Sequence, residues 1–516
     1  MTASNSCSSV DLTKSSLRLT GNKEEETWRE KSKTLLKQIK YLFREITVEP
    51  CLFVYMLCTA LSSLAVQNMH LEKSCRVNCG FSEDICDRIR DRNTTGLESE
   101  LNQVQSLVAK IIAWKFPLQT GIPAVMVLFI GAWSDKTKNR KICILVPFVG
   151  EIIVNFGLLL ATYYFYELSL VATVLIEALP AAFSGSYIVI FMGMYSFMAD
   201  RTTVESRTFR LGLVTICVTL GTPTGTVLSG ILLQSLGYYG VFSTLICLHT
   251  CAFFYGVFRL EDVLPSKEDR PVREDGQSNL KQLWNDVFGL VANTVLVAIR
   301  PRAFGMRKQI LSVIILYVIM VGPLYGDSQV SYLYAIRKFN FNSVEFSVYG
   351  TINIVLGLFG TFFCITILSR TFNVQDSVIG CLAGVSRIAG CLVFALSPNR
   401  TWFYTAPLFN IFSHTGLTAV RSIATKSVPV EEVAKLSSVI GVMEALAPSI
   451  YMPTSSVIYV QTIDTFPGAF YLFDAALTVV ALALFAYIYA LVKRRDVVTD
   501  PDSKEEYART NEVSRF

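Results

Sequence analysis

Ionisable side chains interrupt several stretches of this sequence that are otherwise apolar. Three of them in the second half of the chain are basic: Arg387, His414 and Arg421. His414 and Arg421 are seven residues apart, which on a continuous helix places both side chains on one face. Because an arginine binds a carboxylate through two parallel hydrogen bonds, these residues are predicted to form a substrate-binding pocket for an organic anion. For Arg421 the alternative is a place at the membrane edge, where the side chain reaches the lipid headgroups.

Carboxylates in similar surroundings form a second group of candidates. Glu151, Glu177, Asp327, Glu444 and Asp474 all lie within apolar stretches. A carboxylate in a cavity with little water takes up protons more readily, which is what proton symport requires. Glu177, Asp327 and Glu444 are predicted to carry the coupled protons, and a structural ion pair is the alternative for each of them. Asp474, near the start of its apolar stretch, is expected to be solvated.

The apolar stretches have the length of membrane-spanning helices. A bilayer core about 30 Å thick requires about 20 mostly apolar residues of helix. Such stretches lie at 51–70, 110–132, 142–163, 168–194, 208–233, 238–258, 308–331, 345–368, 374–397, 402–424, 436–461 and 468–491. Only 17% of the residues are charged, against about a quarter in a soluble domain. The prediction is an all-α membrane protein with twelve transmembrane helices in two six-helix halves, although a channel or a receptor would have the same count.

A basic segment separates the two sets of six spans. The predicted parts are an N-terminal tail (1–48), a first half (49–258), a linker (259–307), a second half (308–491) and a C-terminal tail (492–516). Lysine and arginine gather in both tails, in the linker and after the second span, so both termini are expected in the cytoplasm. Residues 280–299 are predicted to form an interfacial helix. This organisation fits the major facilitator architecture, in which substrate binds between two rocking halves.

A polar loop follows the second span and contains Gly131, Asp135, Arg140 and Lys141. It resembles the facilitator-superfamily signature, except that Asn139 stands where a glycine is usual. Gly131 would allow close helix contact, and Asp135 would accept hydrogen bonds from a neighbouring helix or from Arg140. The four residues are therefore predicted to latch the cytoplasmic gate. The alternative is an ordinary basic loop on the cytoplasmic side.

Residues 71–109 form a long loop on the opposite side, and this loop contains Cys75, Cys79 and Cys86. An oxidising exterior allows a disulfide there, and three cysteines leave one that is unpaired or has a distant partner. Asn93 begins an Asn-Thr-Thr sequence in the same loop, so it is predicted to be glycosylated.

Short motifs recur in a fixed order along the chain. They are Val48-Glu49-Pro50, Gly131-Ala132-Trp133-Ser134-Asp135, Asp200 with Ser206-Arg207-Thr208-Phe209-Arg210, Arg421-Ser422, and Val428-Pro429-Val430-Glu431-Glu432. Together they resemble the proton-coupled folate transporter family, solute carrier family 46, over residues 48–490. The resemblance implies proton-driven uptake of organic anions such as folates, or movement of other solutes out of acidic compartments. It also implies that Arg421 serves substrate binding and proton coupling.

One position departs from this resemblance. Thr215 stands where the folate transporter has a glutamate of the fifth span that is important for proton coupling. Either the proton follows another route in this chain or the transport is not driven by protons, and folate is less secure as the substrate.

The function predicted from these features is secondary active transport, as proton-coupled symport of a folate-like organic anion by alternating access. Two alternatives stay open: a family member that moves cell-wall fragments or steroid conjugates, and a non-transporting receptor or scaffold. No enzyme, metal-binding or ATP-binding motif is present in the sequence, so the expected driving force is the proton gradient without a cofactor. The expected partners are the anion, protons and the bilayer, with no nucleic acid. The plasma membrane is the expected location, with the lysosomal membrane as the alternative.

Overall fold

The computed structural model describes residues 46–201, 204–262, 289, 306–428 and 430–499. The chain divides into a short unit, residues 1–50, and a large one, residues 51–516. In the short unit the Glu49 carboxylate accepts hydrogen bonds from the backbone N–H groups of Thr47 and Val48, at 2.9 and 3.0 Å. The interfacial helix predicted at 280–299 lies outside the described residues, apart from Gly289.

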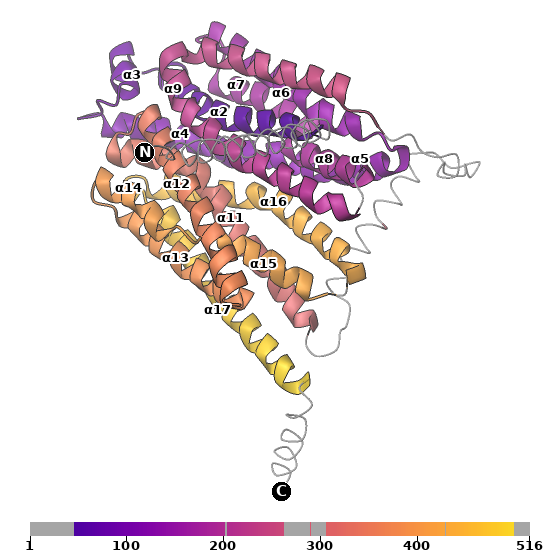
Figure 1. The fold of residues 1–516 in the computed structure, drawn as a ribbon. Helices are drawn as coiled ribbons and strands as arrows, with labels where there is room; N and C mark the ends of the chain where they lie inside the picture. Colours follow the sequence, from indigo (N-terminus) through magenta and orange to yellow (C-terminus); the bar gives the residue numbers. More distant parts are fainter. Residues whose placement is uncertain (1–45, 202–203, 263–288, 290–305, 429, 500–516) are drawn as a thin grey trace, which may run out of the picture. The chain divides into compact units, whose positions relative to one another are not determined.

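All the regular elements among the described residues of the first half are helices. Its elements are α2 (Glu49–Lys73), the π-helical turn η1 (Ser74–Asn78), α3 (Glu83–Arg90), α4 (Glu98–Phe116), the π-helical turn η2 (Pro117–Gly121), α5 (Ile122–Thr137), α6 (Arg140–Tyr163), α7 (Leu170–Ser184), α8 (Ser186–Arg201) and α9 (Val204–Arg259). These are the indigo to magenta helices of Figure 1. Gly185 separates α7 from α8 in the left-handed region, at φ 89°, where a glycine costs little.

The second half follows the same plan. Its elements are α11 (Met306–Phe339), α12 (Ser343–Phe363), the π-helical turn η5 (Cys364–Thr371), α13 (Asp376–Leu396), α14 (Arg400–Phe409), α15 (Thr415–Lys426), α16 (Val430–Thr462) and α17 (Ala469–Thr499). A capping box begins α12, because the Asn342 side chain accepts from the Glu345 N–H and the Glu345 carboxylate accepts from the Asn342 N–H.

The predicted all-α membrane fold is confirmed. Nine helical segments of the described residues are long and apolar enough to cross a bilayer. One of them, Leu213–Arg259, is long enough for two spans and breaks at Gly237, which has φ 63° and ψ −171°. This break falls between the predicted spans 208–233 and 238–258.

The predicted tenth span differs from the structure in one important respect. The sequence led us to expect a continuous helix over 402–424, but α14 ends at Phe409 and α15 begins only at Thr415. The Ser386 hydroxyl of α13 stabilises the break, since it donates to the Phe409 carbonyl at 2.7 Å and accepts from the Phe412 N–H at 3.2 Å. Discontinuous spans of this kind commonly border the substrate and ion sites of transporters.

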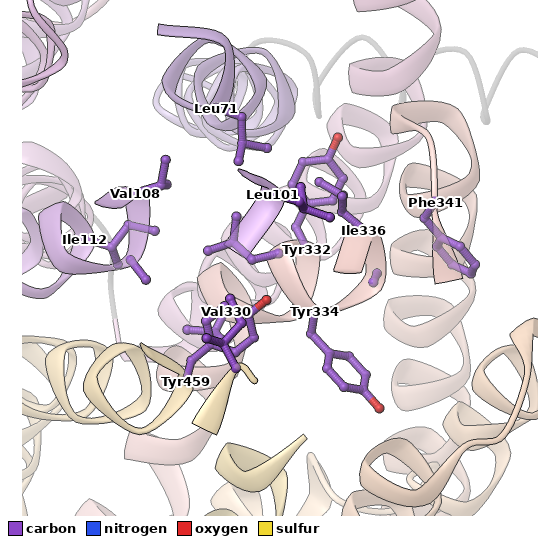
Figure 2. Close-up of a cluster of buried hydrophobic side chains, with 14 of the residues drawn as sticks. Leu71, Leu101, Val108, Ile112, Val330, Tyr332, Tyr334, Ile336, Phe341 and Tyr459 are labelled. Atoms are coloured by element: carbon purple, nitrogen blue, oxygen red, sulfur yellow. The ribbon is translucent and has the colours of Figure 1, made fainter. Parts of the chain in front are cut away.

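The buried apolar side chains show where the two halves meet. One cluster combines α4 residues, such as Leu101, with α11 residues, such as Tyr332 and Ile336 (Figure 2). Two further clusters each stay within one half: the first around Val241 and Leu245, the second around Ile310 and Val313. The halves therefore share a core at the end of the bundle that carries residues 71–109, which were predicted to form a loop but are mostly helical, in α2, η1, α3 and α4.

Candidate functional site

One basic and two acidic residues form a buried triad in the second half: Asp327 of α11, Arg387 of α13 and Asp474 of α17. The Arg387 guanidinium is ion-paired with Asp327, and its Nη2 lies 3.6 Å from Oδ2 of Asp474. The residues are 9%, 6% and 0% exposed, respectively. Asp474, which we expected to be solvated, is fully buried because the side of α17 that bears it packs against α11 and α13.

Small residues allow the helices around the triad to approach closely. A Cβ atom at Gly322 of α11 would lie 2.2 Å from the Tyr451 ring of α16, and one at Gly326 would lie 2.4 Å from the Ser455 hydroxyl. These contacts leave no space for larger side chains between α11 and α16. They hold the stretch of α11 that carries Asp327 against the rest of the second half.

A second charged cluster is more open to solvent. Arg421 Nη2 of α15 lies 2.6 Å from Oε2 of Glu444 on α16 and 2.8 Å from the Tyr317 hydroxyl of α11. The Tyr317 hydroxyl also donates to Glu444 at 2.9 Å. The side chains of Arg421 and Glu444 are 56% and 35% exposed, although Glu444 lies near the middle of a 33-residue helix. The cluster therefore faces a space within the helical bundle that is open to solvent.

Tyrosines of both halves surround this cluster. Tyr187 and Tyr195 of α8 lie within electrostatic range of Glu444, and Tyr187 also lies within range of Tyr325 of α11. Tyr195 also lies within range of Arg421. A guanidinium bordered by aromatic rings can bind the charged group and the apolar body of one ligand at the same time.

A third cluster lies in the first half. Glu177 of α7 forms an ion pair with Lys115 of α4 at 2.5 Å, and its carboxylate lies 3.2 Å from Nε2 of His70 on α2. Glu151 of α6 accepts a hydrogen bond from the Tyr55 hydroxyl at 3.4 Å. All three predicted proton carriers, Glu177, Asp327 and Glu444, thus lie in ion pairs, the arrangement that we gave as their alternative.

The structure does not gather the three predicted substrate-binding residues into one pocket. His414 is the N-cap residue of α15, seven residues before Arg421, and its backbone is still helical, at φ −66° and ψ −22°. Its ring packs on α12, where a Cβ at Gly357 would lie 2.6 Å from Cδ2 of His414. Arg387 has the aspartates as neighbours, and Arg421 has Glu444 and Tyr317. A separate cavity of about 640 Å³ follows α4, η2 and α5, and its lining residues, among them Trp114 and Val125, are not ionisable.

The end of the bundle with the 71–109 loop carries polar contacts between the two halves. Arg92 Nη2, in the loop after α3, donates to Asn68 Oδ1 of α2 at 2.9 Å and to the Tyr332 hydroxyl of α11 at 3.0 Å. The Asn68 amide donates to the Ser343 hydroxyl of α12 at 3.0 Å. We call Arg92, Asn68, Tyr332 and Ser343 the clasp. Arg92 has a left-handed backbone, with φ 63°, a strained conformation that these contacts help to maintain.

Further hydrogen bonds join the halves at the same end. They are Thr94 to Asn340 at 2.8 Å, Asn102 to Asp464 at 2.5 Å, Arg337 to Asn102 at 2.5 Å, and Tyr459 to Gln105 at 2.8 Å. Together with the shared apolar core, they close this end of the bundle.

Replacing Arg92 by alanine is expected to open this end more often. Charge-assisted hydrogen bonds contribute about 1.5–3 kcal/mol each, so losing the contacts of Arg92 should raise the open population by about tenfold or more. Spin labels at Ser99 and Thr401, both exposed, would report a longer distance in this population by electron paramagnetic resonance. Arg88→Ala is the matched control, because the Arg88 guanidinium of α3 donates to the Thr95 carbonyl of the same half at 2.8 Å. An unchanged distance distribution in Arg92→Ala would contradict the clasp.

At the opposite end, the predicted gating residues have partners within the first half. Arg140 Nε donates to Asp200 of α8 at 2.9 Å and its Nη1 to the Ser134 hydroxyl at 3.0 Å. The Lys141 ammonium donates to the Val257 carbonyl at 2.6 Å. The Asp135 side chain lies outside the described part of the chain. A Cβ at Gly131 would meet no atom within 4 Å, so the close helix contact expected there is not present in this conformation.

The loop cysteines and the predicted glycosylation site also have defined positions. Cys75 and Cys86 form a disulfide with a Cα–Cα distance of 5.8 Å, which leaves Cys79 as a free thiol. Asn93 is exposed. A hydrogen bond from Arg76 holds the pKa of Asp87 below its usual range, so this ion pair of the loop persists in an acidic medium.

Comparison with known proteins agrees with this arrangement. The sequence matches the family model of the Major Facilitator Superfamily over residues 51–451. The chain belongs to this superfamily. Superfamily proteins pair two six-helix halves around a central substrate site.

The names of similar proteins include the family that the sequence motifs resemble. The chain is 23% identical over 470 residues to a probable peptidoglycan muropeptide transporter SLC46 of Drosophila melanogaster, with 88% of this chain and 87% of the relative covered. It is 21% identical to the lysosomal proton-coupled steroid conjugate and bile acid symporter SLC46A3 of Gallus gallus, with 86% and 94% covered. The predicted resemblance to solute carrier family 46 is confirmed.

Solved structures show the same fold. A POT family transporter in complex with a thioalcohol-conjugated peptide has a TM-score of 0.59 at 14% identity, covering 88% of this chain and 96% of its own. The human organic anion transporter MFSD10 has a TM-score of 0.56 at 13% identity, covering 85% and 97%. This superfamily consists of membrane transporters, and the chain is a multi-pass transporter of this type.

Proposed function

We propose that this transporter is a proton-coupled symporter of amphipathic organic anions that works by alternating access. The observation that carries the proposal is the half-exposed Arg421 guanidinium, held by Glu444 and Tyr317 in the middle of the bundle. A charged group at this depth is costly in lipid, and it is retained where it contacts substrate or ions. The tyrosines of α8 and α11 around it suit a ligand with a flat apolar body.

The relatives support the same class of substrate. Steroid conjugates, bile acids and muropeptides, the solutes in their names, combine an anionic group with a bulky body. Folate has the same general character and stays within the proposal. Thr215, in place of the expected glutamate, is exposed on α9, so we assign the coupled proton to carboxylates of the second half.

We further propose that the closed end with the 71–109 loop faces the cell exterior or the lumen of an acidic organelle. The Cys75–Cys86 disulfide and the exposed Asn93 suit an oxidising, glycosylating compartment. Lys138, Arg140 and Lys141 at the other end suit the cytoplasm. In this orientation the described conformation is inward-facing, and the plasma membrane and the lysosomal membrane both satisfy it.

The test is uptake by cells that carry the protein at their surface. Radiolabelled folate, a steroid sulfate, a bile acid and a muropeptide are offered in acidic and in neutral medium. At least one of them should accumulate several-fold more in acidic medium, and a protonophore should abolish the difference. Lack of accumulation of all four, with the protein confirmed at the surface, would contradict the proposal.

A further inference from the structure

The buried triad carries more negative than positive charge. Asp327 and Asp474 are both carboxylates, and Arg387 is the guanidinium that contacts them. With both aspartates ionised the triad would have a net charge of −1, in a site where the three residues are at most 9% exposed. An unbalanced charge removed from water is strongly disfavoured unless a proton or another cation neutralises it.

The hydrogen bonding of the aspartates is also incomplete. Oδ1 of Asp327 and both carboxylate oxygens of Asp474 are buried and have no hydrogen-bond partner among the described residues. Buried carboxylate oxygens normally have partners, so unpaired ones call for an explanation. A proton on one aspartate would supply a donor that the other can accept, which satisfies two of these atoms at once.

The other titratable groups that face the triad do not balance its charge. They are Tyr349 of α12, Cys391 of α13, His414 before α15, Tyr451 of α16 and Tyr471 of α17. Tyrosine and cysteine side chains do not become cations. A positive charge on His414 would be repelled by Arg387, the charged group within its electrostatic range. Because none of these groups balances the charge, the two aspartates remain as the groups that bind the neutralising proton.

We propose that Asp327 and Asp474 share one proton and that this pair, with Arg387 as its fixed counter-charge, is the proton-coupling site of the transporter. Two carboxylates that share a site cannot both ionise easily, so the pair takes up one proton rather than two. When water reaches the pair, the proton passes from the carboxyl oxygen to water and the triad returns to a charge of −1. This inference rests on the proposed symport, and it adds Asp474, which the sequence analysis expected to be solvated.

Infrared difference spectroscopy tests the shared proton without any substrate. The purified protein in liposomes is stepped from acidic to alkaline medium, and the C=O band of a buried carboxylic acid is followed. The wild-type protein should show this band at neutral pH. Asp474→Asn and Asp327→Asn should each remove it entirely, because the remaining aspartate then forms a neutral pair with Arg387.

The matched control for these variants is Asp376→Asn. Asp376 is the first residue of α13, where its carboxylate accepts hydrogen bonds from Ser422 and Lys426, and its replacement should leave the band unchanged. A band that survives in either triad variant would overturn the shared proton. Absence of the band in the wild-type protein would overturn it as well, and this measurement requires no variant to fold.

A transport measurement separates this inference from the proposed function. With a radiolabelled steroid sulfate in proteoliposomes, acid-driven accumulation by Asp474→Asn should be at least tenfold lower than by the wild-type protein. Exchange of internal for external substrate should continue in this variant. Equal accumulation by Asp474→Asn and the wild-type protein would overturn the coupling role and leave the proposed symport in place. If the wild-type protein moves none of the offered anions but shows the infrared band, the proposed function fails and the shared proton stands.

Discussion

Arg387→Ala is expected to prevent stable folding. Removal of one partner from a buried ion pair costs about 3–5 kcal/mol, because the other partner keeps an uncompensated charge. Here two carboxylates, Asp327 and Asp474, would lose their counter-charge, and Asp474 is fully buried. The yield of monodisperse protein in detergent and its thermal unfolding temperature should both fall sharply, and uptake should be lost with them.

A neutral version of the triad is the control for this effect. Arg387→Met combined with Asp327→Asn and Asp474→Asn removes all three charges together, so the protein should fold again but not accumulate substrate. Recovery of stability by this triple variant would attribute the damage to unbalanced charge. An Arg387→Ala variant as stable as the wild-type protein would contradict the buried triad.

Arg421→Ala should have the opposite profile, with normal amounts of folded protein at the membrane and at least about tenfold weaker uptake. Its side chain is 56% exposed and its partner Glu444 is 35% exposed, so the loss of this ion pair changes the free energy of unfolding by only about 0–1 kcal/mol. Binding of the anion loses a charge-assisted partner, and a loss of 1.4 kcal/mol already weakens affinity tenfold. Initial uptake rates against substrate concentration, normalised to surface protein, measure this effect.

Arg400→Ala is the matched variant for Arg421→Ala. Arg400 is 49% exposed and is paired with Glu345 at 3.0 Å, near the clasp end rather than in the central space. Its replacement should leave the apparent affinity for substrate unchanged. If Arg421→Ala and Arg400→Ala behave alike, Arg421 has no special role in binding.

The sequence predicted the spans well because membrane insertion depends on a local property, the length of each apolar stretch. It could not predict the break in the tenth span from hydropathy, since residues 402–424 stay mostly apolar across it. Pro407 and the polar run that starts at Asn410 were the available signal, because a proline cannot donate a helical hydrogen bond. The break places His414 at the N-terminus of α15, where its ring packs on α12.

Pairing between helices could not be predicted from the sequence. The triad unites Asp327, Arg387 and Asp474 from three helices that are distant along the chain, and no spacing rule connects them. Arg140 donates to Asp200 and Ser134 because α8 packs against α5, and the sequence does not show this packing. The contacts of Lys115 and Arg92 could not be predicted from the sequence for the same reason, because their partners lie on other helices.

Substrate-evoked proton entry tests the central claim of proton-coupled transport most directly. Proteoliposomes with a pH-sensitive dye inside, and no initial pH gradient, receive each of the four anions in turn from outside. We predict that the transported anion acidifies the interior, and that Asp474→Asn abolishes this acidification. Entry of a labelled anion into wild-type proteoliposomes with no change in internal pH would contradict proton symport.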